Sequence, residues 1–458
     1  MDYRVEHDSM GEVRVPADRY WGAQTERSRN NFPIGVGKET MPEEIIRAFA
    51  LLKSAAAAAN RELRPEKMTD EKETAIRQAA GEVLAGKLSG NFPLVVWQTG
   101  SGTQSNMNMN EVLAARGNEI VGKALLHPND DVNMSQSSND TFPAAMHIAA
   151  AEALERRVLP AVEALIAELH RLETENADVL KCGRTHLQDA TPIRFSQEIS
   201  GWRASLEKDA EMIRTAEKPL LALALGGTAV GTGLNAPAGF DTLAAEKIAQ
   251  ASGMPFVTAE NKFHALTSRD EMVFAHGALK ALACDLMKIA NDTRWLASGP
   301  RLGLGEITIP ENEPGSSIMP GKVNPTQCEQ VTMVAAQVMG NDVTVGIAAS
   351  QGNFELNVFM PVCAYNFLQS ARLLAESMTA FRERCVSGIR PNREKMAENL
   401  SRSLMLVTAL SPRIGYEKAA KTAQKAHRDG TGLKEACVAL GYLTEEEFDE
   451  CFHPEEMV

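Results

Sequence analysis

A series of long helical patterns in the middle of the chain constrains the fold more than any other feature. Around residues 269–298, Ser268 and Glu271 have the spacing of a capping box, and Gly299-Pro300 ends the run. Apolar residues recur between them at helical spacing, at Met272, Ala275, Leu279, Leu282, Leu286 and Ile289. Similar patterns cover residues 143–172, 193–216, 326–350 and 355–388. Five long helices predict a mainly all-α fold class with a long central helical bundle.

Changes in composition predict smaller domains on either side of this bundle. Residues 1–136 mix short helical patterns with turn-rich segments, and residues 393–458 form a charged helical segment. We therefore expect an N-terminal domain over 1–136, a bundle domain over 137–392 and a small helical C-terminal domain over 393–458. Pro160 is expected to kink or break the first long helix, because proline lacks the backbone N–H. Long helices with many Ala and Met positions also favour pairing between subunits.

The net charge and the cysteine pattern exclude several function classes. The chain has 47 basic and 60 acidic side chains, and the net charge of −13 argues against nucleic acid or an anionic membrane as a partner. Long apolar runs are missing, so no membrane span is expected, and the first ten residues lack a signal-peptide pattern. The seven cysteines form no C-x-x-C pair, and the nine histidines form no H-E-x-x-H motif. These features predict a reduced, cytoplasmic protein without a structural metal.

The segment GSSIMPGKVNP at 315–325 carries the clearest chemical signal. Asn324 is suited to cap a helix and Pro325 to occupy its first position. A glycine-rich loop can bring Ser316 to a substrate while Lys322 and Asn324 hold negative charge. A two-serine turn alone is more often an ordinary glycine turn, but the whole string favours chemistry on a small anion.

Three other polar segments share this layout. They are QTGSGTQSNMNMNE at 98–111, SQSSNDTFP at 135–143 and CGRTHLQDATP at 182–192. Each is expected to lead into a helix, and Pro143 and Pro192 are expected in the first turns of theirs. Helix N-termini bind anions through unpaired N–H groups and a partial positive charge. Four such ends brought together would bind a dianion, although one sequence does not reveal whether they meet.

The glycine run GTAVGTG at 227–233 has a different interpretation. Its spacing is not G-x-G-x-x-G, and no strand-like run precedes it, so a dinucleotide site is disfavoured. We expect a turn between helices that borders the active site.

Together these segments resemble class II fumarate hydratase (fumarase C) of the fumarase/aspartase superfamily. The resemblance extends from MGEVRVPADRYWGAQT at 10–25 to the C-terminal FHPEEMV. It implies a lyase that catalyses the reversible hydration of fumarate to L-malate in the tricarboxylic acid cycle. Water is added in the anti sense through an aci-carboxylate carbanion, without metal or other cofactor. The resemblance also implies a homotetramer in which each active site combines loops from three subunits.

The resemblance assigns roles to individual residues. Ser316 corresponds to the catalytic base, and His186 with Glu329 to the pair that handles the hydroxyl or water. The residues that match substrate-binding positions are Ser101, Thr103, Ser137, Ser138, Asn139, Thr185, Lys322 and Asn324. A second dicarboxylate site corresponds to His127, Asn129 and Asp130. The family often has a basic residue at the position of Ala124, so that site is either weakened or served by Lys123 instead.

Three alternatives remain open at this point. An aspartase is the nearest, but aspartases typically have glutamine where this chain has His186. A catalytically silent scaffold protein with the same fold is disfavoured because every catalytic position is filled. An NAD-linked malate enzyme is disfavoured because the nucleotide fingerprint is missing.

Overall fold

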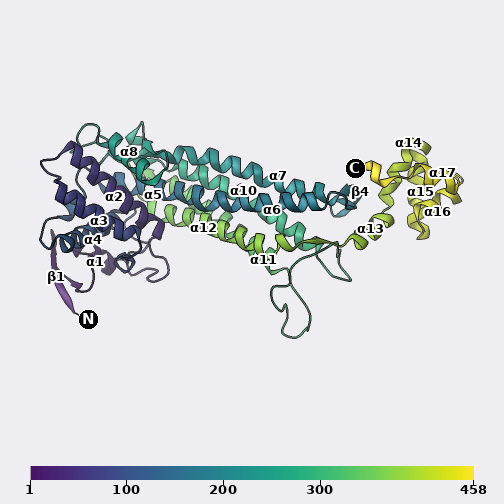
Figure 1. Ribbon diagram of the computed structural model, residues 1–458, viewed down its shortest axis with the longest axis horizontal. Coiled ribbons are helices and arrows are strands. Elements are labelled where there is room, and N and C mark those ends of the chain that lie inside the picture. Colours follow the sequence, from purple (N-terminus) through teal and green to yellow (C-terminus); the bar gives the residue numbers. More distant parts are fainter. Residues whose placement is uncertain (1) are drawn as a thin grey trace. The chain divides into compact units, whose positions relative to one another are not determined.

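A computed structural model describes residues 2–458 and has the mainly all-α fold that the sequence predicts (Figure 1). The five expected long helices are all present. Their bounds are α5 Ser138–Ala153 with α6 Leu159–Glu175, α7 Phe195–Glu217, α10 Asp270–Leu296, α11 Thr326–Ala349 and α12 Met360–Arg384. A π-helical turn, Leu154–Val158, separates α5 from α6 directly before Pro160. The helical run is therefore irregular near Pro160, which is the second residue of α6, and the kink or break at this proline stays a prediction.

The chain divides into two compact units, each assembled from three stretches of sequence. Unit 1 comprises Met1–Pro160, Asp209–Ala283 and Ala335–Ala375, and unit 2 comprises Ala161–Lys208, Cys284–Val334 and Glu376–Val458. Helices α7, α10, α11 and α12 contribute residues to both units. This grouping follows spatial contacts. The linear division into 1–136, 137–392 and 393–458 stays a prediction.

Unit 1 is organised around α2, an alanine-rich helix. Its helices outside the long bundle are α1 Ala23–Asn31, α2 Glu43–Leu63, α3 Asp70–Leu84, α4 Thr103–Val121, α8 Phe240–Ser252 and α9 Lys262–Thr267. Helix α2 packs against α3, α5 and α8, and its Ala55, Ala56 and Ala59 are buried. Small side chains allow such close approach. The ring of Phe49 on α2 meets Phe142 on α5 edge to face at 5.8 Å.

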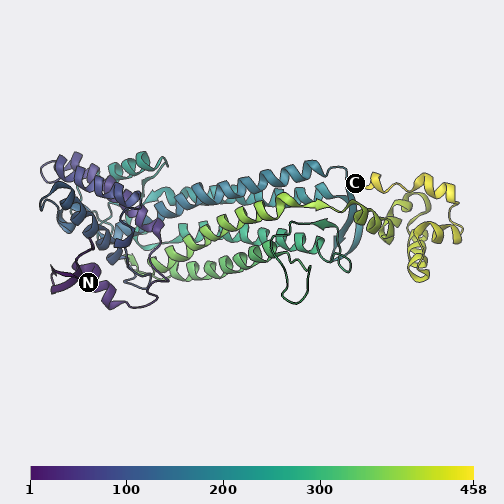
Figure 2. The same cartoon turned by 60° about the horizontal axis from the view of Figure 1, so that its bottom comes forward.

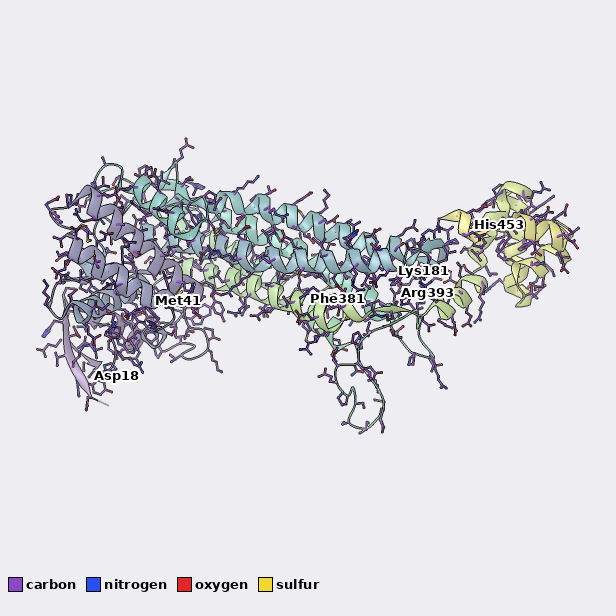
Figure 3. All side chains as sticks on the ribbon, in the orientation of Figure 1. Asp18, Met41, Lys181, Phe381, Arg393 and His453 are labelled. Carbon is purple, nitrogen blue, oxygen red and sulfur yellow. The ribbon has the colours of Figure 1, made fainter. Side chains whose placement is uncertain are left out.

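Unit 2 contains a strand hairpin and the C-terminal helices. The short helices are α13 Arg393–Arg402, α14 Ser411–Ile414, α15 Tyr416–Asp429, α16 Leu433–Ala439 and α17 Glu445–Cys451. Cys182 on the hairpin belongs to the buried apolar cluster of these helices, together with Leu410 and Phe448. Figure 3 shows Lys181 of the hairpin beside Arg393 of α13. The hairpin is thereby attached to the C-terminal segment.

Among the described residues, strands occur only as two-stranded sheets. The longest are the antiparallel pairs β1 Tyr3–Asp8 with β2 Gly11–Pro16 and β3 Leu180–Thr185 with β4 Gln188–Arg194. The others are two-residue strands, namely β5 Ala222–Leu223, β6 Val257–Thr258, β7 Ile307–Thr308, β8 Gly352–Asn353, β9 Leu356–Asn357 and β10 Arg390–Pro391. The pairing register of β3 with β4 shifts between Cys182 and Arg184, close to His186.

Three predicted helix starts differ from the structure, including that of α11, where Pro325 precedes the first helical residue. Pro143 lies inside α5, because the capping box of Ser137 and Asp140 starts that helix earlier. Pro192 lies on β4, before α7 begins. Helix α11 begins at Thr326, and the Asn324 amide donates to the Gly315 carbonyl oxygen at 2.7 Å. The structure uses this asparagine to close a loop.

Helix α11 is long and apolar enough, by length and composition, to cross a membrane, with a mean hydropathy of 1.2. Core helices of water-soluble proteins pass the same test. Its Asn341 and Asp342 hydrogen-bond to side chains of α10 and α12, including His276 and Ser370. These polar contacts favour a packed protein helix over a lipid-exposed one.

Candidate active site

A chain of hydroxyl groups in unit 1 joins the starts of α4 and α5. Ser101 Oγ lies 2.7 Å from Thr103 Oγ1, which lies 2.8 Å from Ser138 Oγ. Gly102 between them has φ of 71°, and a Cβ there would lie 2.0 Å from the Phe142 ring. Only glycine allows this approach. Three predicted substrate-binding residues are thus brought together.

The start of α5 is fixed by its capping box. The Ser137 side chain accepts from the Asn139 N–H, and Asp140 Oδ1 accepts from the Ser137 N–H. Asp140 Oδ2 also accepts from the N–H groups of Gly226 and Thr228, both at 2.9 Å. Asn139 Nδ2 donates to the Ala229 carbonyl oxygen at 2.8 Å. The glycine run is therefore a turn, as predicted, and it borders Asn139.

A buried lysine lies beneath this helix start. Lys53 on α2 is fully buried and donates to Asn133 Oδ1 and Gln136 Oε1, at 3.0 and 2.9 Å. Burial lowers the pKa of Lys53 to about 7, although Asp140 opposes the shift. Burial likewise raises the pKa of Asp140 to about 6 against its three N–H donors and Lys53. The sequence analysis missed both residues, yet a lysine within an apolar, alanine-rich helix was a visible signal.

In unit 2, His186 lies at the tip of the β3–β4 hairpin. His186 and Leu187 form a two-residue turn, with φ values of 56° and 61°. Positive φ is uncommon for such side chains, and strained positions of this kind cluster at functional sites. Thr185 and His186 are both exposed. The hairpin therefore presents the predicted acid–base histidine outward.

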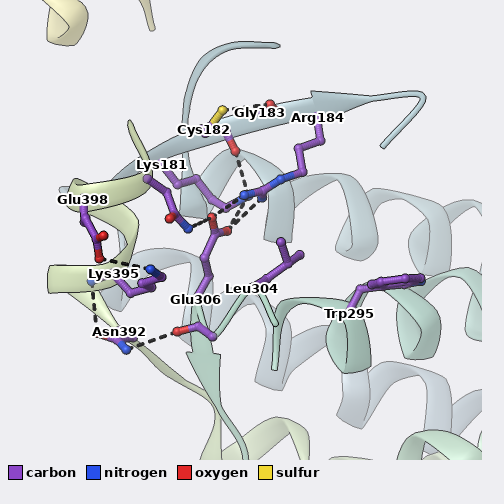
Figure 4. A network of polar contacts seen from close by, with 12 residues as sticks. Lys181, Cys182, Gly183, Arg184, Trp295, Leu304, Glu306, Asn392, Lys395 and Glu398 are labelled. Carbon is purple, nitrogen blue, oxygen red and sulfur yellow. Dashed lines mark hydrogen bonds and ion pairs between the residues drawn. The ribbon is translucent and has the colours of Figure 1, made fainter. Parts of the chain in front are cut away.

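A buried ion-pair network anchors this hairpin (Figure 4). Arg184 donates two hydrogen bonds to the fully buried Glu306, at 2.6 and 3.0 Å. Lys181 Nζ lies 3.5 Å from the same carboxylate, and Asn399 Nδ2 donates to it at 2.9 Å. Burial raises the pKa of Glu306, but Arg184 and Lys181 outweigh burial and hold that pKa below its usual range. Glu306 is thus an anion that fixes the strand leading to Thr185.

The segment with Ser316 forms an open loop before α11 (Figures 1 and 2). Two hydrogen bonds hold the two ends of this loop together. Asn324 Nδ2 donates to the Gly315 carbonyl oxygen, and the Gly315 N–H donates to the Lys322 carbonyl oxygen at 2.8 Å. Ser316 Oγ accepts from the N–H groups of Met319 and Ile318, at 3.0 and 3.3 Å. Two donors aimed at one hydroxyl oxygen favour its anionic form.

The remaining predicted residues form no hydrogen bond to these groups among the contacts of the described residues. Glu329 is exposed in the first turn of α11 in unit 2. In unit 1, His127 and Asn129 are exposed, and His127 Nδ1 accepts from the Asp130 N–H at 3.2 Å. Lys123 forms an ion pair with Glu71 at 2.6 Å.

Comparisons with known proteins decide the family. A lyase family model matches residues 11–340, and a fumarase C C-terminal model matches residues 406–458. The class II fumarate hydratase of Bacillus cereus is 61% identical over 100% of this chain and 99% of its own length. The chain belongs to the class II fumarate hydratase family. The resemblance seen in the sequence is therefore confirmed.

Further members and solved structures agree with this assignment. The class II fumarate hydratase of Bacillus subtilis is 60% identical over the same shares of the two chains. The crystal structure of a class II fumarase from Schistosoma mansoni has a TM-score of 0.97 and 43% identity, covering 100% of this chain and 99% of that one. A fumarate lyase:delta crystallin structure from Brucella melitensis, bound to cobalt, has a TM-score of 0.94 and 41% identity over the same shares.

Proposed function

We propose that this chain catalyses the reversible hydration of fumarate to L-malate. The observation that carries the proposal is the full-length identity of about 60% to enzymes named class II fumarate hydratase. The site residues support it, because hydroxyl, amide and ammonium groups are the donors that a small dicarboxylate requires. We assign the reaction to the tricarboxylic acid cycle and the protein to the cytoplasm.

The difficult step is removal of a proton beside a carboxylate. Ser316 is the proposed base, and the Met319 and Ile318 N–H groups stabilise its alkoxide. The product carbanion is an aci-carboxylate dianion, which fixed donors must stabilise. Lys322 and Asn324 lie on the same loop and are assigned that role.

The hydroxyl group leaves on the opposite side of the substrate and is protonated as it departs. His186 is the proposed acid, paired with Glu329, since a carboxylate orients an imidazole and stabilises its cation. Thr185 precedes His186 and is assigned to substrate binding.

The starts of α4 and α5 hold the substrate carboxylates. Ser101, Thr103 and Ser138 are already linked to one another, and Asn139 is anchored by Ala229. The helix ends add N–H donors and a partial positive charge. His127, Asn129 and Asp130 are proposed as the second dicarboxylate site. The Lys123–Glu71 ion pair argues that this lysine does not serve it.

The working form is proposed to be a homotetramer, because a single chain leaves large apolar surfaces exposed. On α11 the side chains of Met333, Val343 and Ile347 are 67%, 62% and 57% exposed. A mostly apolar cavity of about 380 Å³ is lined by residues that include Ile347, Trp97 and Phe359. Exposed apolar side chains on long helices are typical of subunit interfaces. His186 and Glu329 are exposed in one chain, and other copies would complete their surroundings.

The test is ultraviolet absorbance with L-malate in buffer that contains chelator and no added cofactor. L-Aspartate is run in parallel. Rising fumarate absorbance with malate alone is expected. A rise with aspartate alone would assign the chain to aspartase chemistry, and no rise with either would support a silent scaffold.

A further inference from the structure

A cluster of imidazole and carboxylate groups lies at the junction of α9 and α10, outside the proposed catalytic residues. One donor atom each from His264, Asp270 and Glu271 lies within 4.8 Å of the other two. His264 Nε2 is 3.2 Å from Asp270 Oδ1, and His264 Nδ1 is 3.7 Å from Glu271 Oε1. All three residues belong to unit 1. Such a cluster alone does not make a site.

A second observation comes from α5, where His147 is only 5% exposed. Its Nδ1 lies 2.9 Å from the Ala222 carbonyl oxygen, which can only accept, so Nδ1 carries the proton. The neutral ring therefore has a lone pair on Nε2. That atom is buried without a hydrogen-bond partner, 4.0 Å from Glu271 Oε2. A lone pair and a carboxylate that face each other without a donor between them are unfavourable, and a positively charged group placed between them would satisfy both.

We propose that His147, His264, Asp270 and Glu271 form a binding site for a divalent transition metal of the zinc class. Two imidazoles and two carboxylates are a ligand set that zinc and cobalt accept. The hydrogen bond from His147 Nδ1 to a backbone carbonyl is the usual outer-shell support of a metal-bound histidine. Tetrahedral bonds of about 2.1 Å place ligand atoms roughly 3.4 Å apart. One ligand atom each of His264, Asp270 and Glu271 lies within 4.8 Å of the others, and His147 Nε2 is 4.0 Å from Glu271 Oε2, so the side chains must move closer together to bind the ion.

The buried Arg269 limits the affinity of this site. It is 1% exposed, and its Nε and Nη1 atoms have no hydrogen-bond partner. Its positive charge acts on both His147 and Glu271. The carboxyl groups of Asp270 and Glu271 oppose this single positive charge. We expect weaker binding than at a structural zinc site made of thiolates.

The metal joins α5, α9 and α10 and takes no part in the proposed hydration. Ser138 and Asn139 lie on α5 about 12 Å from His147, at eight or nine residues of helical rise. Binding to the folded state alone stabilises unit 1 in proportion to the logarithm of the metal concentration. The site is independent of the proposed function, because no ligand belongs to the catalytic groups.

The experiment uses the full chain after chelator treatment and removal of the chelator. Zinc or cobalt chloride is titrated in by calorimetry, and the visible absorbance of cobalt reports the ligand geometry. We expect one metal per chain and a rise in Tm with zinc. Glu271→Gln and His264→Ala should each weaken binding at least tenfold and abolish the rise in Tm.

The matched control is His170→Ala. His170 forms an exposed pair with Glu173 at 3.9 Å on α6, and its loss should leave metal binding unchanged. His147→Gln should also weaken binding, and the exposed His264 keeps the test valid if that buried variant does not fold. No binding by the parent chain would overturn the proposal. Binding that survives Glu271→Gln or His264→Ala would also overturn it.

Discussion

The start of α5 and the Ser316 loop both place serines before or within a helix start, but they are supported in opposite ways. Ser137, Ser138 and Asn139 are linked to α4, to the 226–229 turn and, through Asp140, to the buried region around Lys53. Ser316 lies on a mostly exposed loop and accepts hydrogen bonds from two backbone N–H groups of that loop, and Asn324 holds the two ends of the loop together. The proposed substrate-binding groups are therefore held in place by other elements of unit 1, whereas the proposed base is held by its own loop.

The largest expected effect follows from Ser316→Ala. Removing a general base should lower kcat by about a thousandfold. The Tm should stay within about 1 °C of the parent, because Ser316 lies on a mostly exposed loop and changes at such positions seldom alter stability much. Steady-state kinetics and a thermal melt measure both quantities. Near-normal turnover would contradict the assignment of the base.

His186→Asn should lower kcat by about a hundredfold, because the acid that protonates the leaving hydroxyl is lost. Asparagine tolerates the positive φ of the turn, so the variant should keep the oligomeric state of the parent. Gel filtration and kinetics together are the measurement. A variant that dissociates or melts much earlier would make this histidine a structural residue.

Glu306→Gln tests the anchor of the hairpin. Loss of one partner leaves Lys181 and Arg184 without their shared carboxylate, which should cost about 3 kcal/mol of unfolding free energy. Chemical denaturation measures this loss, and kcat should fall as the His186 turn loosens. The control is Arg393→Ala, which removes an exposed ion pair with Asp178. This variant should lose less than about 1 kcal/mol of unfolding free energy. Equal stability of Glu306→Gln and the control would contradict the proposed anchor.

The smallest effect concerns the pH dependence produced by Lys53. Its folded pKa of about 7 lies below the ordinary lysine value of 10.5, so the unfolded chain binds more protons between these values. Stability of the parent relative to Lys53→Met should therefore rise with pH, by about 1 kcal/mol per unit between pH 7.5 and 8.5. Asp140 is ionised in both states there and adds no slope. Parallel stability curves for the two proteins would contradict a perturbed lysine.

The long helices were predictable because their signals are local. The apolar period of residues 269–298 matches α10, Asp270–Leu296, closely. The predicted capping box is not formed as expected, because the Ser268 hydroxyl hydrogen-bonds to Asp270 and not to Glu271. The error at Pro143 arose because the Ser137–Asp140 capping box decides where α5 begins, and the proline is tolerated five residues later. The preference of proline for the first helical turn and the capping box predict different starts for this helix, and the contacts around the capping box decide between them.

The β3–β4 hairpin could not be predicted, because its turn is made by His186 and Leu187 without asparagine or glycine. Its support comes from Glu306, which is 122 residues from Arg184 in sequence. The roles of Ser316, His186 and Glu329 came from the resemblance to a family. They stay predictions until variants are measured.

The measurement that tests the account most directly mixes two inactive variants. Ser316→Ala removes the proposed base on unit 2, and Asn139→Ala removes a proposed binding group on unit 1. If each active site combines segments from different subunits, denaturing and refolding the two together should restore fumarate hydration in mixed tetramers. Each variant refolded alone should stay inactive. Activity of the mixture no greater than the sum of the two variants would contradict a site shared between subunits.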